Sequence, residues 1–306
     1  MPLRIGTRGS AMALYQAGFV RDRLCAAHPE LAAEGAVELV PIRTTGDREQ
    51  TRLLAEIGGK GLFTKEIEAA LLDRRIDLAV HSLKDMETVL PAGLEIGAVL
   101  ARDDPRDALV SRDGGGLADL PDRARIGTAS LRRRAQLLRQ RGDLEVLPVR
   151  GNVGTRLAKL ASGEFDALVL ALCGLERLGK AALASEILAP ELMLPAVGQG
   201  VLAIECRAAE TSLPQILAPL NDPMTAACAV AERAMLAALD GSCRTPIAGL
   251  ATIAEGRLTL DALLLSTDGS AERRGRVEGA IGEAAALGNE LGARLRRDAG
   301  AEFGFG

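Results

Sequence analysis

The sequence predicts an α/β fold, with two similar α/β domains flanking a cleft and a small C-terminal α+β domain. Three observations predict it: short apolar strands alternate with amphipathic helices, a segment near the N-terminus recurs in mid-chain, and the pattern changes after about residue 221. The 306 residues suffice for two or three domains. Strands that alternate with helices imply crossover connections and mainly parallel sheets.

The internal repeat begins with Arg4-Ile-Gly-Thr7, which recurs as Arg125-Ile-Gly-Thr128. Each copy is followed by a serine and a helical run, and then by a glycine-containing loop, a helix and a strand. Two matches in the same order favour a duplicated unit. Ligands of such sheets bind at the carboxyl ends of the strands, beside helix N-termini that favour anions. We therefore expect both Gly-Thr turns to face an anionic ligand.

The domain boundaries follow from the order of the elements. Residues 91–107 are predicted to cross between the halves, residues 194–200 to return, and the strand 201–205 to rejoin the first domain. The third domain is expected to contain helices at 224–239 and 281–297 and strands at 246–253 and 257–265. The predicted domains are 1–100 with 201–219, then 101–200, then 220–306.

Composition narrows the function classes. A net charge of −4 and an aromatic content of 2% argue against nucleic-acid binding, which commonly uses a basic surface and stacking aromatics. No apolar run approaches the roughly 20 residues that cross a bilayer, and no apolar signal core opens the chain. Five scattered cysteines and two histidines suggest neither disulfides nor a metal site. We expect a cytoplasmic protein that binds no membrane and no metal.

The segment 123–156 carries nine arginines and only two acids. Guanidinium groups stay charged at any working pH and pair with carboxylates or phosphates in bidentate geometry. The cluster therefore predicts a polyanionic ligand held in one place.

The segment His81-Ser-Leu-Lys-Asp85 follows a predicted strand and should lie at the ligand-binding end of the first sheet. Lys84 offers a cation for substrate anions, and Asp85 offers a carboxylate that can move a proton or stabilise a cation. The residues alone favour equally the alternative that this segment is a charged loop exposed to solvent, without a role in binding or catalysis. His81 is expected to be structural rather than catalytic.

Two further segments are candidates for a functional role. Cys243 lies in a tight polar turn beside Arg244, where a neighbouring cation favours thiolate, so it is a candidate nucleophile or attachment point. The glycine-rich segment 58–61 follows a polar stretch and is a candidate mobile lid. It lacks the Walker A spacing.

Seven motifs occur together and resemble those of the porphobilinogen deaminases, also called hydroxymethylbilane synthases. They are Gly6-Thr-Arg-Gly-Ser10, Gly59-Lys-Gly-Leu-Phe-Thr-Lys-Glu66, His81-Ser-Leu-Lys-Asp85, Gly127-Thr-Ala-Ser-Leu-Arg-Arg133, Arg150-Gly-Asn-Val-Gly-Thr-Arg156, Ala196-Val-Gly-Gln-Gly200 and Gly241-Ser-Cys243. Each motif alone is weak, but their order and their spread over nearly the whole chain are highly specific.

The resemblance implies an ammonia-releasing transferase that condenses four porphobilinogen molecules head to tail into hydroxymethylbilane, in tetrapyrrole (haem, chlorophyll or corrin) biosynthesis. It also implies a monomer whose first two domains are similar to periplasmic binding proteins. By the same resemblance Cys243 carries a dipyrromethane cofactor through a thioether, and Asp85 is the catalytic carboxylate.

The remaining site residues are likewise implied by the resemblance. The cofactor-binding positions are Ser82, Lys84, Asp85, Thr128, Ser130, Arg132 and Arg133. The positions that hold the acetate and propionate groups of substrate and growing chain are Arg8, Ser10, Gln16, Arg150, Arg156 and Arg177. The mobile-loop positions are Lys60 and Phe63.

The chain departs from the family pattern at two points. Met86-Glu87 stands where the family usually has a proline two residues after the Lys-Asp pair, which alters the turn and adds a negative charge. Ser242 replaces a glycine that is common before the cysteine. We expect neither change to remove activity.

The main alternative is a binding protein of the same two-lobed fold that only captures a carboxylated ligand. Cys243 and the third domain argue against it, because a simple receptor needs neither. A nucleic-acid role for Arg132-Arg-Arg134 is weaker, for want of net positive charge.

Overall fold

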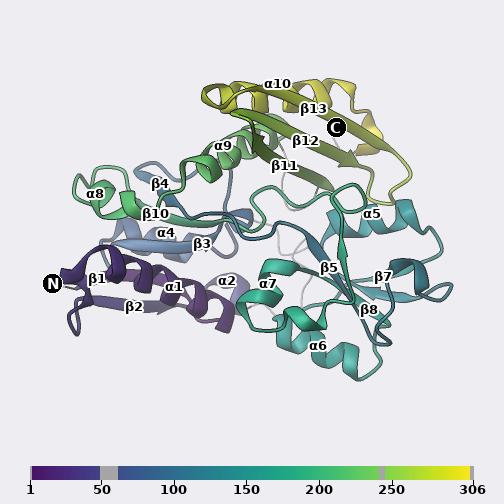
Figure 1. The fold of residues 1–306 in the computed structure, drawn as a ribbon, viewed down its shortest axis with the longest axis horizontal. Helices are drawn as coiled ribbons and strands as arrows, with labels where there is room; N and C mark the ends of the chain where they lie inside the picture. Colours follow the sequence, from purple (N-terminus) through teal and green to yellow (C-terminus); the bar gives the residue numbers. More distant parts are fainter. Residues whose placement is uncertain (1, 49–60, 241–244, 304–306) are drawn as a thin grey trace. The chain divides into compact units, whose positions relative to one another are not determined.

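A computed structural model describes residues 2–48, 61–240 and 245–303 (Figure 1). The chain divides into two compact units, Met1–Arg102 with Gly200–Ala226, and Asp103–Gln199 with Ala227–Gly306. The predicted second and third domains fall within one unit, so the three-domain division stays a prediction.

The first unit contains a five-stranded sheet in the order β2-β1-β3-β10-β4. β1 pairs in parallel with β2 and β3, whereas β10 is antiparallel to both β3 and β4. The strands are β1 (Leu3–Arg8), β2 (Val37–Ile42), β3 (Leu78–Ser82), β4 (Leu94–Val99) and β10 (Leu202–Arg207). The helices are α1 (Ala11–Ala27), α2 (Thr45–Arg48), α4 (Lys65–Leu72) and α8 (Leu213–Leu217), with 3-10 turns η1 (Pro29–Ala32), η2 (Leu83–Asp85) and η5 (Ala218–Leu220).

The second unit repeats this topology in the order β7-β6-β8-β5-β9. β6 is parallel to β7 and β8, and β5 is antiparallel to β8 and β9. The strands are β5 (Asp107–Ser111), β6 (Arg125–Gly127), β7 (Glu145–Leu147), β8 (Ala167–Ala171) and β9 (Glu186–Leu188). The helices are α5 (Leu131–Gln140), α6 (Val153–Ala161) and α7 (Leu172–Arg177), with 3-10 turns η3 (Leu117–Asp119) and η4 (Ala181–Leu183).

The repeat extends to side-chain contacts. Arg4 donates through its backbone N–H and its guanidinium to Asp77, and Arg125 does the same to Asp166. Ser10 caps the N-terminus of α1, as Ser130 caps that of α5. The predicted duplication is therefore confirmed in topology and in local contacts.

The expectation of mainly parallel sheets is wrong, because each sheet is mixed. β10 follows β4 in the first sheet only after the intervening residues 103–199, which belong to the second unit, and no helical crossover fixes its direction relative to β3. Residues 91–107 are also more than a crossing, because β4 lies within them and buries Leu94, Ala98 and Val99. The predicted strand 201–205 is confirmed as part of β10.

The C-terminal part of the second unit is an antiparallel sheet, β11-β12-β13, that packs with two long helices around one core. The predicted helices and strands of this region are confirmed, but β13 was not expected. Only Val277 of its nine residues is buried, so the apolar pattern of a core strand is missing. The elements are α9 (Pro223–Ala238), β11 (Ile247–Ala254), β12 (Arg257–Leu265), β13 (Glu272–Ala280) and α10 (Ala284–Asp298), with 3-10 turns η6 (Ile281–Glu283) and η7 (Ala301–Phe303).

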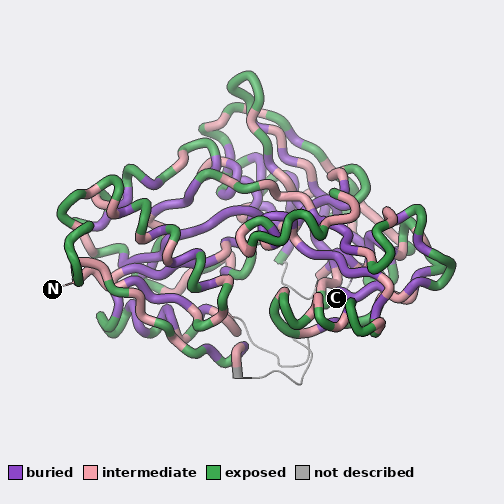
Figure 2. The backbone as a smooth tube through the Cα atoms, turned by 60° about the horizontal axis from the view of Figure 1, so that its bottom comes forward, coloured by how far each residue is buried: buried purple, intermediate pink, exposed green. Residues whose placement is uncertain are grey.

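Burial follows the central strands (Figure 2). Every residue of β10 is buried, and so are the first four residues of β5 and β8. β3 and β6, whose carboxyl ends lie beside the candidate residues Ser82 and Thr128, pair with these buried strands. No helix in the described ranges is long and apolar enough to cross a membrane.

Candidate active site

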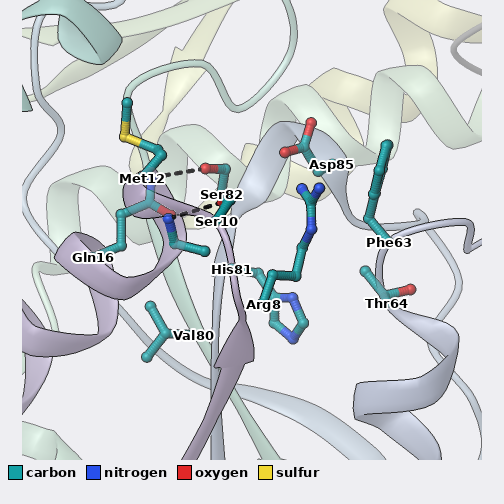
Figure 3. A pocket seen from close by; sticks show the side chains of 11 residues that line it. Arg8, Ser10, Met12, Gln16, Phe63, Thr64, Val80, His81, Ser82 and Asp85 are labelled. Atoms are coloured by element: carbon teal, nitrogen blue, oxygen red, sulfur yellow. Dashed lines mark hydrogen bonds between the residues drawn. The ribbon is translucent and has the colours of Figure 1, made fainter. Parts of the chain in front are cut away.

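A pocket in the first unit lies where β1 and β3 end and α1 begins (Figure 3). Arg8 is the last residue of β1, Ser82 is the last of β3, and Asp85 ends the short turn η2. The pocket is lined by Arg8, Ser10, Met12, Ala13, Gln16, Phe63, Thr64, Val80, His81, Ser82 and Asp85. The structure thus brings together six of the sequence-predicted site residues, Arg8, Ser10, Gln16, Phe63, Ser82 and Asp85.

One wall of the pocket is held by a hydrogen bond between α1 and β3 and by the N-terminal cap of α1. The amide Nε2 of the buried Gln16 donates to Ser82 Oγ at 3.0 Å, and Ser10 Oγ accepts from the backbone N–H of Ala13 at 3.3 Å. These polar groups are oriented by neighbours that are themselves fixed, which suits them to bind a polar ligand.

The opposite wall combines opposite charges. The exposed Asp85 carboxylate points toward the guanidinium of Arg8 (Figure 3). Lys84, also exposed, precedes Asp85 in the same turn. A cation and an anion on one wall can bind a carboxylated ligand and stabilise positive charge that develops on it.

One of the lining residues is a buried histidine, His81. His81 Nε2 is 3.1 Å from Glu205 Oε2, and the two side chains are 4% and 0% exposed. Nearby, burial raises the pKa of Glu68, and the charge of Glu205 adds to this effect. The buried pairing agrees with the expected structural role of His81.

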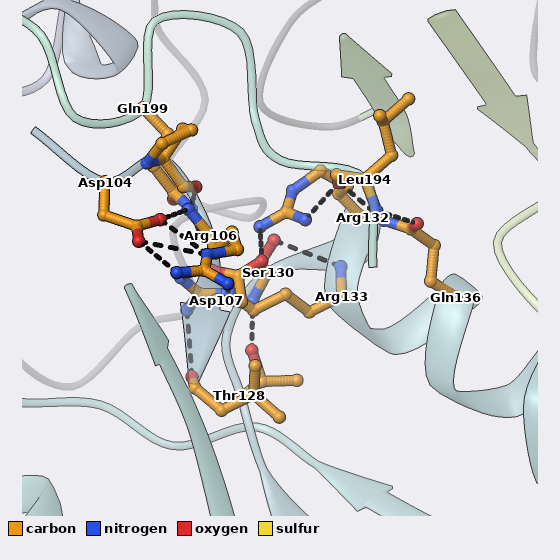
Figure 4. A network of polar contacts seen from close by, with 12 residues as sticks. Asp104, Arg106, Asp107, Thr128, Ser130, Arg132, Arg133, Gln136, Leu194 and Gln199 are labelled. Atoms are coloured by element: carbon orange, nitrogen blue, oxygen red, sulfur yellow. Dashed lines mark hydrogen bonds and ion pairs between the residues drawn. The ribbon is translucent and has the colours of Figure 1, made fainter. Parts of the chain in front are cut away.

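In the second unit, Asp107 organises a network of polar contacts (Figure 4). Its carboxylate is fully buried and accepts hydrogen bonds from three side chains: Arg132 Nη2 at 2.7 Å, Arg133 Nη2 at 2.7 Å and Gln199 Nε2 at 2.9 Å. Burial alone would raise the Asp107 pKa, but the two guanidinium charges outweigh it and hold the pKa far below its ordinary value. Asp107 is therefore ionised and fixes both arginines.

The predicted cofactor positions Thr128 and Ser130 lie in the same network. The backbone N–H of Ser130 donates to Thr128 Oγ1 at 3.2 Å, and Ser130 Oγ accepts from the backbone N–H of Arg133 at 3.4 Å. Four predicted residues, Thr128, Ser130, Arg132 and Arg133, are thus brought together at the start of α5.

A second cationic group lies close to Arg133. The pKa of Arg156 is lowered to about 10 by burial and by the charges of Arg133 and Arg150. Gly151 between them has φ 106°, and a Cβ there would lie 2.7 Å from Thr155, so the turn requires glycine. Three crowded guanidinium groups favour an anionic ligand.

Two buried donors point to the same conclusion. Among the described residues, Arg132 Nε and Arg150 Nη1 are buried without a hydrogen-bond partner. Such atoms are rare, because an unpaired buried donor costs about 1–3 kcal/mol. A ligand with carboxylate groups would satisfy them.

The remaining predictions have mixed outcomes. Arg177 donates to Asp103 at 2.8 Å, so this predicted substrate position already has a carboxylate partner. Lys60 and Cys243 lie outside the described residues. The four cysteines that the structure describes, Cys25, Cys173, Cys206 and Cys228, are free.

The arginine cluster is more dispersed than the sequence suggested. Six of its nine arginines pair with carboxylates: Arg123 with Glu145, Arg125 with Asp166, Arg132 and Arg133 with Asp107, Arg139 with Glu272, and Arg141 with Asp143. The interpretation that all nine face one ligand is wrong, because the two acids within the segment, Asp143 and Glu145, and three from other parts of the chain, Asp107, Asp166 and Glu272, pair with six of them. Arg150 and Arg156 remain as the group that is crowded by like charges.

Comparison with known proteins gives matches over almost the whole chain. The family profile described as porphobilinogen deaminase, dipyromethane cofactor binding domain, matches residues 3–215, and the one described as porphobilinogen deaminase, C-terminal domain, matches residues 226–297. The chain belongs to the porphobilinogen deaminase family.

Individual relatives agree with this. The chain is 52% identical to the porphobilinogen deaminase of Sorangium cellulosum (strain So ce56) over 299 residues, which cover 96% of this chain and 98% of that protein. It is 48% identical to the porphobilinogen deaminase of Syntrophobacter fumaroxidans (strain DSM 10017 / MPOB) over 293 residues, covering 96% and 94%. It is 51% identical to that of Paracoccus denitrificans (strain Pd 1222) over 302 residues, covering 99% and 96%.

Sequence reasoning missed several residues that shape these deaminase-family sites. Asp47, Asp107 and Glu205 each contact a candidate residue or a pocket residue, as Asp47 does with Arg8. Their partners lie between 25 and 124 positions away in the sequence. A local motif carries no signal for such pairs.

Proposed function

We propose that this chain is a hydroxymethylbilane synthase, which deaminates four porphobilinogen molecules and joins them head to tail. The observation that carries the proposal is the Asp85 carboxylate in a pocket that also contains Arg8 and the hydrogen-bonded pair Gln16 and Ser82. Membership in the porphobilinogen deaminase family supports it.

Asp85 acts on the aminomethyl group of the substrate. It assists protonation of the departing amine, the carbon–nitrogen bond breaks, and ammonia leaves with the electron pair. The cationic azafulvene that remains is stabilised by the carboxylate, which holds the pyrrole N–H. The terminal ring carbon of the growing pyrrole chain then attacks the methylene carbon, and its proton passes to water as the new carbon–carbon bond forms. After four additions, water hydrolyses the carbon–carbon bond between the four-unit chain and its primer: the hydroxyl group adds to the methylene carbon, a proton goes to the ring carbon of the primer, and hydroxymethylbilane leaves.

The arginines hold the carboxylates of substrate and chain. Each porphobilinogen adds an acetate and a propionate, so the bound chain becomes more anionic as it grows. Arg8 in the first domain and the crowded Arg150 and Arg156 in the second are suited to this role, because their guanidinium forks match carboxylate geometry. Ser10, Gln16 and Arg177 complete the proposed substrate contacts.

Dipyrromethane fits the residues that are present. The unpaired buried Nε of Arg132 and Nη1 of Arg150 call for acceptor groups, and the carboxylates of dipyrromethane supply them. When bound, it supplies the primer to which the first substrate is joined. The residues that would hold it are Ser82, Lys84, Asp85, Thr128, Ser130, Arg132 and Arg133. Its attachment through a thioether to Cys243 belongs to the proposal, as does a role of Lys60 and Phe63 in a loop over the substrate.

We also propose that the protein is cytoplasmic and monomeric. A thioether survives a reducing compartment, in which the free thiols at Cys25, Cys173, Cys206 and Cys228 also persist. Size-exclusion chromatography with light scattering tests the oligomeric state: a mass of about twice the 32.0 kDa chain contradicts the monomer.

Turnover of porphobilinogen tests the function. We expect the wild-type protein to release ammonia and form hydroxymethylbilane. In the Asp85→Asn variant, kcat should fall by a factor on the order of 10²–10⁴. Asp113→Asn, a change at an 86% exposed side chain outside the pocket, serves as the control. Near-normal turnover by Asp85→Asn rules out the assigned role, and a wild-type protein that forms no product rules out the function.

A further inference from the structure

Arg8 is held on two sides within the first unit. Its Nε and Nη2 donate to Asp47 Oδ1 at 3.2 and 2.5 Å, and its guanidinium carbon lies 4.1 Å from the ring centroid of Phe63. The face of the arginine that matches a carboxylate is therefore already engaged by a carboxylate.

Asp47 is itself firmly oriented. Its Oδ2 accepts from Oγ1 of the fully buried Thr44 at 2.8 Å. The backbone N–H of Gly46 donates to the carbonyl of Leu62 at 2.9 Å, and a Cβ on Gly46 would lie 2.2 Å from the Phe63 ring. Residues 44–47 and Phe63 are thus packed together, and only glycine at position 46 allows this approach.

The contact is an ion pair at neutral pH. Burial raises the pKa of Asp47, but hydrogen bonds from Arg8 and Thr44 outweigh it, and the net result is a pKa below the ordinary value. The side chains of Arg8 and Asp47 are 25% and 21% exposed, so water screens the pair only in part.

We propose that Asp47 takes the place of a substrate carboxylate on Arg8 in the ligand-free protein, and that porphobilinogen must displace it. The inference rests on the proposed function and assigns Asp47 as a residue that determines specificity. One guanidinium fork binds one carboxylate in bidentate geometry, so the two carboxylates compete for it. A ligand without a carboxylate in this position cannot displace Asp47, and a ligand that has one binds more weakly than it would to a free Arg8.

The chain contains a matched control for this pair. Arg4, at the other end of β1, donates to Asp77 through Nε at 3.1 Å and Nη2 at 2.9 Å, and the two side chains are 33% and 20% exposed. The Arg4–Asp77 pair has the same chemistry and similar exposure, but neither residue lines the pocket.

The test is the KM for porphobilinogen in four proteins: wild type, Asp47→Asn, Asp47→Glu and Asp77→Asn. We expect Asp47→Asn to lower KM about three- to tenfold, the range of a partly exposed ion pair, with a smaller change in kcat. Asp47→Glu keeps a competing carboxylate and should stay near the wild-type KM, and Asp77→Asn should leave KM unchanged. An unchanged or raised KM in Asp47→Asn overturns the inference, because Asp47 would then merely position Arg8.

A second variant covers a failure of Asp47→Asn to fold. Thr44→Val removes the hydroxyl that orients Asp47 at nearly constant volume, and should lower KM in the same direction by a smaller factor; no decrease there also overturns the inference. If the wild-type protein turns over no porphobilinogen at all, it is the proposed function that fails.

Discussion

The carboxylate of Asp107 lies 2.7 Å from Nη2 of Arg133, in a fully buried contact that also includes Arg132. A single negative charge thus holds the two arginines that are proposed to bind the cofactor. One carboxylate against two guanidinium groups leaves net positive charge for an anionic ligand.

Replacing Asp107 with asparagine should destabilise the protein strongly. The two guanidinium groups would stay buried without a counter-charge, which costs about 3–5 kcal/mol. Urea unfolding measures the loss. Asp104→Asn removes the partner of Arg106 in a more exposed pair, with side chains 25% and 40% exposed, and should cost about 1 kcal/mol or less. Equal losses in the two variants would contradict the assigned role of Asp107.

The contact of Asp107 with Arg132 and Arg133 also predicts a pH dependence of stability. The pKa of Asp107 is held far below its ordinary value in the folded protein, so the folded state binds fewer protons at this site than the unfolded state. Its contribution is therefore fully present above the unfolded pKa of about 4 and is lost as the pH falls toward the folded pKa. The difference in unfolding free energy between wild type and Asp107→Asn should be constant from pH 5 to about 8 and should shrink below about pH 4. A difference that grows on acidification would contradict this.

Arg156→Gln should stabilise the ligand-free protein while it weakens substrate binding. The pKa of Arg156 is lowered to about 10 by burial and by Arg133 and Arg150, which means that folding disfavours its charge. Removing that charge should raise the unfolding free energy by about 1–2 kcal/mol. KM for porphobilinogen should rise, because an anion-binding group is lost. Lys159→Gln on the same helix removes a 37% exposed cation that pairs with Glu164 rather than lying among other cations, and should change neither quantity by much. A destabilised Arg156→Gln variant would contradict the crowding of like charges.

The turn between β12 and β13 packs against α5, and a substitution at Gly269 in that turn tests the contact. Gly256, between β11 and β12, is the control. Gly269 and Gly256 have nearly equal φ values of 76° and 75°, so alanine is strained at both. A Cβ on Gly269 would lie 2.4 Å from the Ala135 carbonyl oxygen, whereas nothing lies within 4 Å of one on Gly256. Gly256→Ala should cost about 1 kcal/mol and Gly269→Ala at least about 2 kcal/mol more, measured by thermal or urea unfolding. Similar losses would mean that this contact is absent in solution.

Much of the fold could be predicted from local sequence patterns. The Gly-Thr turns after Arg4-Ile and Arg125-Ile, each followed by a serine, predict two related domains, and the structure confirms the relation by the capping role of both serines and the shared strand order. The directions of β10 and β5 could not be predicted, because no local pattern fixes how a strand pairs when it enters a sheet from a distant part of the chain. β13 was missed because only one of its nine side chains is buried.

The candidate site was predictable only in part. Motifs identified Arg8, Ser82 and Asp85, which the structure brings into one pocket. The carboxylates that control the arginines, Asp47 and Asp107, lie 39 and 25–26 positions from their partners, and pairing over such separations depends on the tertiary fold. The count of arginines and acids in the segment 123–156 therefore overestimates how many arginines face a ligand.

Intact mass spectrometry of the purified protein, with Cys243→Ser alongside, tests the central claim most directly. The account predicts that the wild-type mass exceeds the 32.0 kDa of the chain by two linked pyrrole units, that the variant lacks this addition, and that porphobilinogen adds further pyrrole units to the wild-type protein only. An unmodified wild-type protein that acquires no pyrrole units after incubation with porphobilinogen or preformed hydroxymethylbilane would contradict it.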